Sequence, residues 1–289
     1  MTDFVFIDSG VGGIPYMTAL LEKEPGASCV YVADNKNFPY GEKSHDEVVE
    51  CVTAVVEKIC ERFEPAVIVL ACNTISVNAL EVLRQKFPQV QFVGTVPAIK
   101  LAATVSQKKR IGLIASKSTC ENPYNIELKN QFADDCELIM RPDSNLISFI
   151  EEKGFSGTET ELEEAVRPAI DFFREQNCDV IILGCTHFLN IKNVFEKVAH
   201  NCAVPELVEG PIQIVDSVDG VVRQMIKVRA LRSYEALRQA QGPQGVQGPQ
   251  GVQGPQGAQL YITSPDSISE QEKYKSICAH FNISFGGNI

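Results

Sequence analysis

Short runs of apolar, mostly β-branched residues recur along this chain and are separated by longer segments with apolar positions every three to four residues. Uninterrupted apolar runs of this length are typical of strands buried on both faces of a parallel sheet. The intervening spacing, clearest over 44–63, predicts helices that cover such a sheet. The predicted strands lie at 4–7, 29–33, 67–71, 92–97, 110–116, 180–185, 212–215 and 260–263. Strands that alternate with helices in this way predict an α/β fold.

Two of these runs end in the same way. At 67–74 and at 180–187 a β-branched run stops at a cysteine, Cys72 or Cys185, and hydrogen-bonding residues follow. A single strand-end cysteine is as well explained by packing as by chemistry, because cysteine is among the residues most often buried. The repeated polar context favours chemistry, since open α/β sheets bind ligands beyond the carboxyl ends of their strands. We predict two pseudo-symmetric open-sheet α/β domains that face each other across an active-site cleft.

The length of 289 residues suits two domains. The strand at 212–215 is expected to return to the first sheet, which divides the chain into a discontinuous first domain, 1–97 plus 214–289, and a second domain, 98–213. Between about 241 and 259 glycine falls at every third position in a Gly-Pro-Gln repeat. These triplets are too few for a collagen triple helix and have little to bury, so we expect a flexible insertion.

Composition limits the classes of binding partner and indicates the cellular compartment. A formal net charge of -11 argues against nucleic acid as a partner, because binding phosphates requires a basic face. No basic n-region or long apolar run opens the chain, so we expect neither a signal peptide nor a membrane span. The ten cysteines form no Cys-x-x-Cys pair and are interpreted as reduced thiols of a cytoplasmic protein.

The first strand is followed by Asp8, Ser9 and a glycine-rich turn at 10–13. Glycines there can expose backbone amides around a concavity suited to an anion. The spacing differs from the G-x-G-x-x-G of dinucleotide folds, so no nucleotide site is predicted. Asp8 is expected in the cleft, although a capping role for the next helix is the alternative. Further along, Ser44 with Glu47 and Thr160 with Glu163 predict capping boxes.

Three chemistries use two such cysteines. In two-base proton transfer, one thiolate removes a proton from a carbon and the opposite thiol delivers one to the other face, without a cofactor. A free cysteine with a pKa near 8.5 is only a few per cent thiolate at neutral pH. Asp8 and His187 are therefore the candidate groups that tune the thiols or relay protons to and from them. Covalent catalysis by Cys185 with His187 as base leaves Cys72 unused. A zinc site of Cys72, Cys185, His187 and Asp8 has suitable ligand types but lacks the usual spacing.

These residues resemble the cofactor-independent glutamate racemases of the aspartate/glutamate racemase superfamily. The matching motifs occur in the family's order and cover nearly the whole chain apart from the glycine repeat. They are Asp8-Ser9-Gly10-Val11-Gly12-Gly13, Pro39-Tyr40-Gly41, Cys72-Asn73-Thr74, Cys185-Thr186-His187 and Asp216-Ser217. The chain departs from the family in Ala115-Ser116, where Gly-Thr is usual, in Leu189 for a proline, and in Asn35 for a threonine.

The resemblance implies an enzyme that interconverts L- and D-glutamate with no metal or other cofactor and supplies D-glutamate for peptidoglycan. Cys72 would act on the D-enantiomer and Cys185 on the L-enantiomer, assisted by Asp8 and His187. The substrate's charged groups would be held by Ser9, Pro39, Tyr40, Gly41, Asn73, Thr74, Thr119 and Thr186. Asp34 and Glu151 fall where the family carries acidic residues linked to activity, and a homodimer is compatible with the resemblance.

Two other functions stay open from sequence. One is a racemase or isomerase of the same superfamily that acts on another amino acid or diacid. The other is a binding protein whose cleft only holds an acidic ligand. Exchange of the α-hydrogen of glutamate with solvent deuterium separates an enzyme from a binder.

Overall fold

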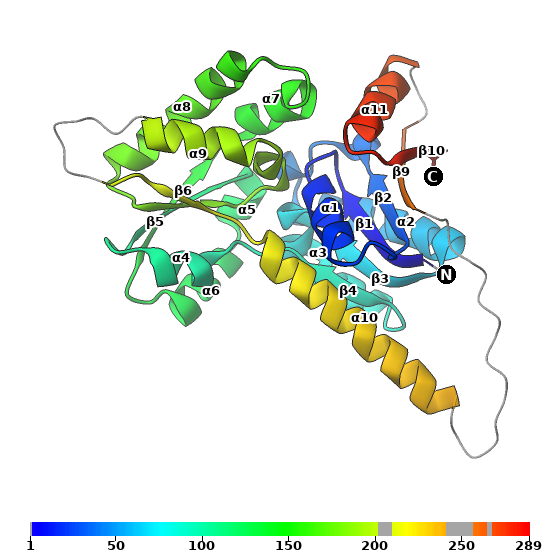
Figure 1. Cartoon of the computed structure of the whole chain (residues 1–289). Helices are drawn as coiled ribbons and strands as arrows, with labels where there is room; N and C mark the ends of the chain where they lie inside the picture. The colour runs from blue at the N-terminus through cyan, green and yellow to red at the C-terminus, as the bar shows by residue number, and fades with distance from the viewer. Residues whose placement is uncertain (1, 202–209, 241–256, 265–267) are drawn as a thin grey trace.

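The protein is described by a computed structural model covering residues 2–201, 210–240, 257–264 and 268–289 (Figure 1). Most of the glycine repeat lies outside these residues. Its last residues belong to a strand that begins at Ala258, so the predicted insertion ends earlier than 259. No helix within the described ranges is both long enough and apolar enough to cross a bilayer.

The strands form two parallel sheets, as predicted for an α/β fold. The first sheet has the order β10-β9-β2-β1-β3-β4 and the second has the order β6-β5-β7-β8. The strands of the first sheet are β1 (Thr2–Asp8), β2 (Cys29–Ala33), β3 (Pro65–Leu70), β4 (Gln91–Gly94), β9 (Ala258–Ile262) and β10 (Ser284–Asn288). Those of the second are β5 (Arg110–Ala115), β6 (Glu137–Pro142), β7 (Val180–Leu183) and β8 (Gln213–Val215).

The strand order reveals an internal repeat, because β2-β1-β3-β4 and β6-β5-β7-β8 follow the same path in chain order. Register aligns the two halves residue by residue. Ile7 lies opposite Leu70 in the first sheet, and Ile114 lies opposite Leu183 in the second. Counting on from these pairs makes Cys72 and Cys185 equivalent positions, each two residues beyond the third strand of its sheet. The predicted pseudo-symmetry is therefore a property of the backbone.

Helices cover both faces of each sheet, which explains why the inner strands β2, β3 and β7 are apolar along their whole length. In the first half, α1 (Ile14–Lys23), α10 (Val218–Ala240) and α11 (Ile268–His280) pack on one face, and α2 (His45–Phe63) and α3 (Asn73–Lys86) on the other. In the second half, one face carries α7 (Ser144–Lys153), α8 (Glu159–Glu175) and α9 (Lys192–Asn201). The opposite face carries α4 (Ile99–Val105), α5 (Lys117–Glu121) and α6 (Tyr124–Phe132). The described residues also form 3₁₀ turns, namely η1 (Asn35–Asn37), η2 (Tyr40–Glu42) and η3 (Thr186–Ile191).

Two sequence expectations were wrong. The strand at 212–215 does not return to the first sheet, because β8 pairs with β7 and extends the second sheet. The chain returns to the first half through α10, β9 and β10 instead. The predicted capping box at Thr160 lies two residues too late, since Thr158 and Glu161 form it, whereas the box of Ser44 and Glu47 is present as predicted.

Candidate active site

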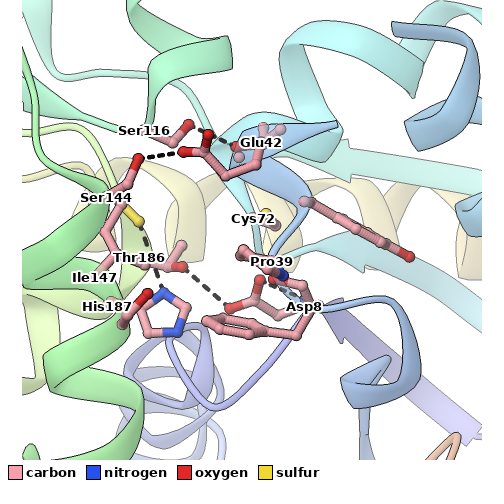
Figure 2. Close-up of a pocket in the computed structure, with 16 residues that line it drawn as sticks. Asp8, Pro39, Glu42, Cys72, Ser116, Ser144, Ile147, Thr186 and His187 are labelled. Carbon is pink, nitrogen blue, oxygen red and sulfur yellow. Dashed lines mark hydrogen bonds between the residues drawn. The ribbon is translucent and has the colours of Figure 1, made fainter. Parts of the chain in front are cut away.

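A small cavity lies between the two halves, at the carboxyl ends of the central strands of both sheets. Its volume is about 50 Å³, which is room for roughly three to five ordered waters. Figure 2 shows Asp8, Pro39 and Cys72 entering from one half, and Ser144, Ile147 and His187 from the other. The predicted residues that line it are Asp8, Ser9, Pro39, Tyr40, Gly41, Cys72, Thr74, Cys185, Thr186 and His187.

Cys72 lies two residues beyond β3, at the N-cap position of α3. Its side chain is 6% exposed and hydrogen-bonds to Asp8, which ends the neighbouring strand β1. Burial and the adjacent Asp8 charge raise the pKa of Cys72 well above its usual range, although the Ile75 amide at the start of α3 opposes this. Burial also raises the pKa of Asp8, against the charge of His187 and the hydrogen bonds that the carboxylate accepts. This half therefore favours a protonated thiol.

Cys185 occupies the equivalent position after β7 but has a different neighbour. The 3₁₀ turn that follows brings Nδ1 of His187 to 3.7 Å from the cysteine sulfur. Nε2 of His187 lies 2.9 Å from Oε2 of Glu151, which comes from α7. Burial alone would lower the pKa of His187, but the bonds and charges of Cys185 and Glu151 outweigh it and raise that pKa well above its usual range. The imidazolium thus lies between the Glu151 carboxylate and the sulfur of Cys185 and can donate a hydrogen bond to each.

Side chains bridge the halves around the cavity. Thr186 donates a hydrogen bond to Oδ2 of Asp8 at 3.1 Å. The hydroxyl oxygens of Thr74 and Ser116 lie 2.9 Å apart. Ser144 donates to the Glu42 carboxylate (Figure 2). The cavity is thus closed by polar contacts between residues far apart in the chain.

Four predicted residues lie behind the cavity wall and do not line it. Asp34 accepts hydrogen bonds from the hydroxyls of Tyr40 and Thr263 and so holds Tyr40 in place. Thr119 lies 3.0 Å from the Ser116 hydroxyl. Asn73 is buried at the start of α3, and its Oδ1 has no partner among the described residues. Glu151 reaches the site only through His187.

Sequence reasoning missed several lining residues: Phe38, Glu42, Ser116, Ser144, Ile147 and Ser148. Ser116 could have been found, because register makes it the counterpart of Ser9. Ser144, Ile147 and Ser148 belong to the first two turns of α7, and no strand-end pattern points to them.

The glycine-rich turn after β1 serves close approach between the halves. A Cβ atom on Gly12 would lie 2.6 Å from both Nδ1 of His187 and Oγ1 of Thr186, and one on Gly10 would lie 2.4 Å from Oε2 of Glu151. The turn was expected to hold an anion, and the carboxylate of Glu151 takes that place: the Val11 amide donates to Oε2 of Glu151 at 3.1 Å. Glu151 of the second half thus hydrogen-bonds to the glycine-rich turn of the first half.

The zinc hypothesis finds no support in this arrangement. Within the described part of the chain, no three His, Cys, Asp or Glu side chains are grouped so that they could hold a metal ion. The hydrogen bonds of His187 to Glu151 and Cys185 use both of its ring nitrogens. The geometry instead offers two sulfurs on one cavity, each with its own ionisable partner.

Comparison with known proteins agrees with this geometry. The family model for Asp/Glu/Hydantoin racemase matches residues 14–225. A glutamate racemase of Treponema pallidum (strain Nichols) is 42% identical over 226 residues, which is 78% of this chain and 80% of that protein. One from Actinobacillus pleuropneumoniae serotype 3 is 39% identical over 67% of this chain and 72% of its own.

A solved structure of similar fold is Escherichia coli glutamate racemase in complex with L-glutamate and the activator UDP-MurNAc-Ala. It is 26% identical, with a TM-score of 0.79 over 100% of this chain and 98% of that one. The chain belongs to the Asp/Glu/hydantoin racemase family and, within it, to the glutamate racemases, which are isomerases.

Proposed function

We propose that this enzyme interconverts L- and D-glutamate by two-base proton transfer between Cys72 and Cys185. The observation that carries the proposal is that two cysteines at equivalent strand ends line the same cavity. Support for glutamate as substrate comes from the names of the relatives and from the L-glutamate complex of the Escherichia coli enzyme.

In the L-to-D direction, the Cys185 thiolate takes the α-proton of L-glutamate and becomes a thiol. The electron pair left on the α-carbon delocalises into the adjacent carboxylate. The Cys72 thiol then donates its proton to the opposite face, which gives D-glutamate and leaves Cys72 as thiolate. The D-to-L direction reverses each step. His187 supports the thiolate of Cys185, and Asp8 accepts a hydrogen bond from the Cys72 thiol and orients it.

Hydroxyl groups and backbone amides would bind the substrate's charges. Ser9, Thr74 and Thr186 supply hydroxyls, and the Pro39-Tyr40-Gly41 turn supplies backbone around them. Asn73 and Thr119 would act from behind the wall. No lysine or arginine is among the residues that line the cavity in the described structure, so hydrogen-bond donors and the His187 imidazolium must stabilise the carboxylates and the developing negative charge. Because the cavity has room for only a few waters, the residues around it must move apart to admit glutamate.

The remaining parts of the proposal concern context. We propose that the chain has two domains, with boundaries near residue 97 and just after β8, and that the enzyme acts in the cytoplasm. Its product, D-glutamate, would be used for peptidoglycan. Neither pyridoxal phosphate nor a metal has a role in the proposed steps.

The test is incubation of the purified protein with L- or D-glutamate in deuterium oxide without added cofactor. We expect loss of optical rotation and incorporation of deuterium at the α-carbon from either enantiomer. Protein that binds glutamate but exchanges no α-hydrogen would be a binder, and activity on aspartate or another diacid alone would assign a different superfamily activity. Activity that disappears after exhaustive chelation would contradict the cofactor-free scheme.

A further inference from the structure

One charged residue outside the cavity contacts the chain of groups that leads to Cys185. Nζ of Lys273, on α11, lies 3.1 Å from Oε1 of Glu151. The Tyr274 hydroxyl lies 3.4 Å from the same oxygen. Glu151 comes from α7 of the second half, whereas α11 packs in the first half, so this pair joins elements that are more than a hundred residues apart in sequence.

The two oxygens of Glu151 have separate partners. Oε2 receives the Val11 amide at 3.1 Å and faces Nε2 of His187 at 2.9 Å. Oε1 faces Lys273 and, at a longer distance, Tyr274. Because Glu151 is only 6% exposed, an ionised carboxylate there depends on such partners. Lys273 supplies the only full positive charge on the Oε1 side among the contacts described for Glu151.

We propose that Lys273 is a positioning residue for the racemisation, which fixes and neutralises Oε1 of Glu151 so that Oε2 holds His187 against the sulfur of Cys185. The inference rests on the proposed function and extends it to a residue beyond the cavity. Lys273 touches neither substrate nor sulfur. It acts through the carboxylate and the imidazole.

The charges around this relay come from several elements. Glu151 faces His187, Lys273 and Tyr274, and it also influences Tyr31 of β2. Cys185 and His187 are faced by Asp8 from β1, Cys72 after β3, Cys120 of α5 and Tyr16 of α1. Of these groups, only His187 and Lys273 carry a positive charge, and His187 already lies against the sulfur of Cys185. The bonds and charges of His187 and Lys273 lower the pKa of Glu151 despite its burial.

The consequence is a dependence on pH. Without the Lys273 charge, Glu151 ionises less readily and His187 holds its proton less firmly, so fewer molecules carry an imidazolium beside the sulfur of Cys185 near neutral pH. The defect should therefore vary with pH, because it arises from proton binding at Glu151 and His187. A residue that merely stabilises α11 would lower activity at all pH values alike.

The test compares Lys273→Met with Lys273→Arg, which keeps the charge, and with Lys86→Met, which removes a lysine of another single ion pair at 2.9 Å. Two readouts are taken between pH 6 and 9.5. One is kcat/KM for each enantiomer. The other is the rate at which iodoacetamide alkylates Cys185 without substrate, followed by peptide mass mapping.

For Lys273→Met we expect kcat/KM to fall about three- to tenfold at pH 7, a modest factor because the lysine side chain is 35% exposed. The fall must be equal in both directions, since the enantiomers have equal free energy in water. Alkylation of Cys185 should slow by a similar factor, both defects should change between pH 6 and 9.5, and Lys273→Arg should restore most of each. Lys86→Met should resemble the wild type.

Unchanged kinetics in Lys273→Met, or a loss that is uniform across pH with unchanged alkylation, would overturn the proposal. If the wild type itself racemises nothing, the proposed function fails, but the alkylation of Cys185 still tests the relay through Glu151 and His187 on its own.

Discussion

The two halves of the molecule share a backbone plan but place different side chains at matching positions. Register makes Cys72 equivalent to Cys185 and Ser9 equivalent to Ser116. Asp8, however, corresponds to Ala115, and His187 corresponds to Thr74. The carboxylate therefore belongs to one half and the imidazole to the other.

This difference gives two similar sulfurs opposite electrostatic surroundings. Cys72 is buried beside a carboxylate, which raises the pKa of its thiol, whereas Cys185 is partly buried beside the imidazolium of His187. Two-base catalysis needs one acid and one base at the same moment. A perfectly symmetric site would leave both sulfurs in the same state, so the asymmetry of their neighbours prepares the site for one direction of transfer.

The largest expected effect comes from replacing either sulfur. Cys72→Ser and Cys185→Ser should each lower kcat by at least about a thousandfold, because a serine hydroxyl is far too weak an acid to replace the thiol. Polarimetry with each enantiomer measures the loss, and Cys60→Ser on α2 serves as the control because Cys60 does not line the cavity. Full activity in either variant would rule out two-base proton transfer, because that mechanism requires both cysteines.

Close approach of the halves is tested at Gly12. Its replacement by alanine should push His187 and Thr186 away, because the new Cβ would lie 2.6 Å from atoms of both. If these side chains shift by about 1 Å to avoid the clash, kcat/KM should fall about ten- to a hundredfold. Gly26→Ala is the matched control, since nothing lies within 4 Å of its Cβ position. Equal activities of the two variants would show that the halves need not meet there.

Asp8→Asn tests the carboxylate that only the first half carries. Burial raises the pKa of Asp8, so the folded protein binds a proton more tightly than the unfolded chain. The ionised side chain then lowers stability as pH rises from about 4 through the raised pKa. We expect Asp8→Asn to increase the free energy of unfolding by about 1 kcal/mol at pH 7 and to lower kcat about tenfold or more.

Denaturant unfolding at several pH values measures this effect, and the gain should vanish toward pH 4. Asp3→Asn, on the same strand, should give no gain, because Asp3 accepts hydrogen bonds from Ser28. A destabilised Asp8→Asn protein at pH 7 would contradict the cost assigned to the buried carboxylate.

The smallest expected effect concerns a segment that only the first half contains. Figure 1 shows the C-terminal end of α10 well away from β9, so simple excision of 241–258 would strain the connection and remove the first residue of β9. Replacing 241–256 by a Gly/Ser linker of equal length should leave kcat, KM and the melting temperature unchanged within error. A marked loss of activity would give the repeat a role in the site.

Local patterns were sufficient for much of the fold and part of the site. The strands at 67–71 and 180–185, the capping box at Ser44 and the cavity position of both cysteines follow from runs of apolar residues and the residues that end them. Pairing of β8 with β7 did not follow, because a three-residue strand carries no information about its partner. Ser144 and Ile147 were missed for a related reason, since a helix end reaches the cavity only through the packing of one half on the other.

The sequence by itself determined two α/β halves with a cysteine at the same place in each, because strand periodicity and strand-end residues are local properties. Only the tertiary structure decided which charges each sulfur meets. Asp8 reaches Cys72 across 64 residues, Glu151 reaches His187 across 36, and Lys273 reaches Glu151 across 122. Electrostatic interactions depend on distance and burial in space, which no spacing along the chain specifies.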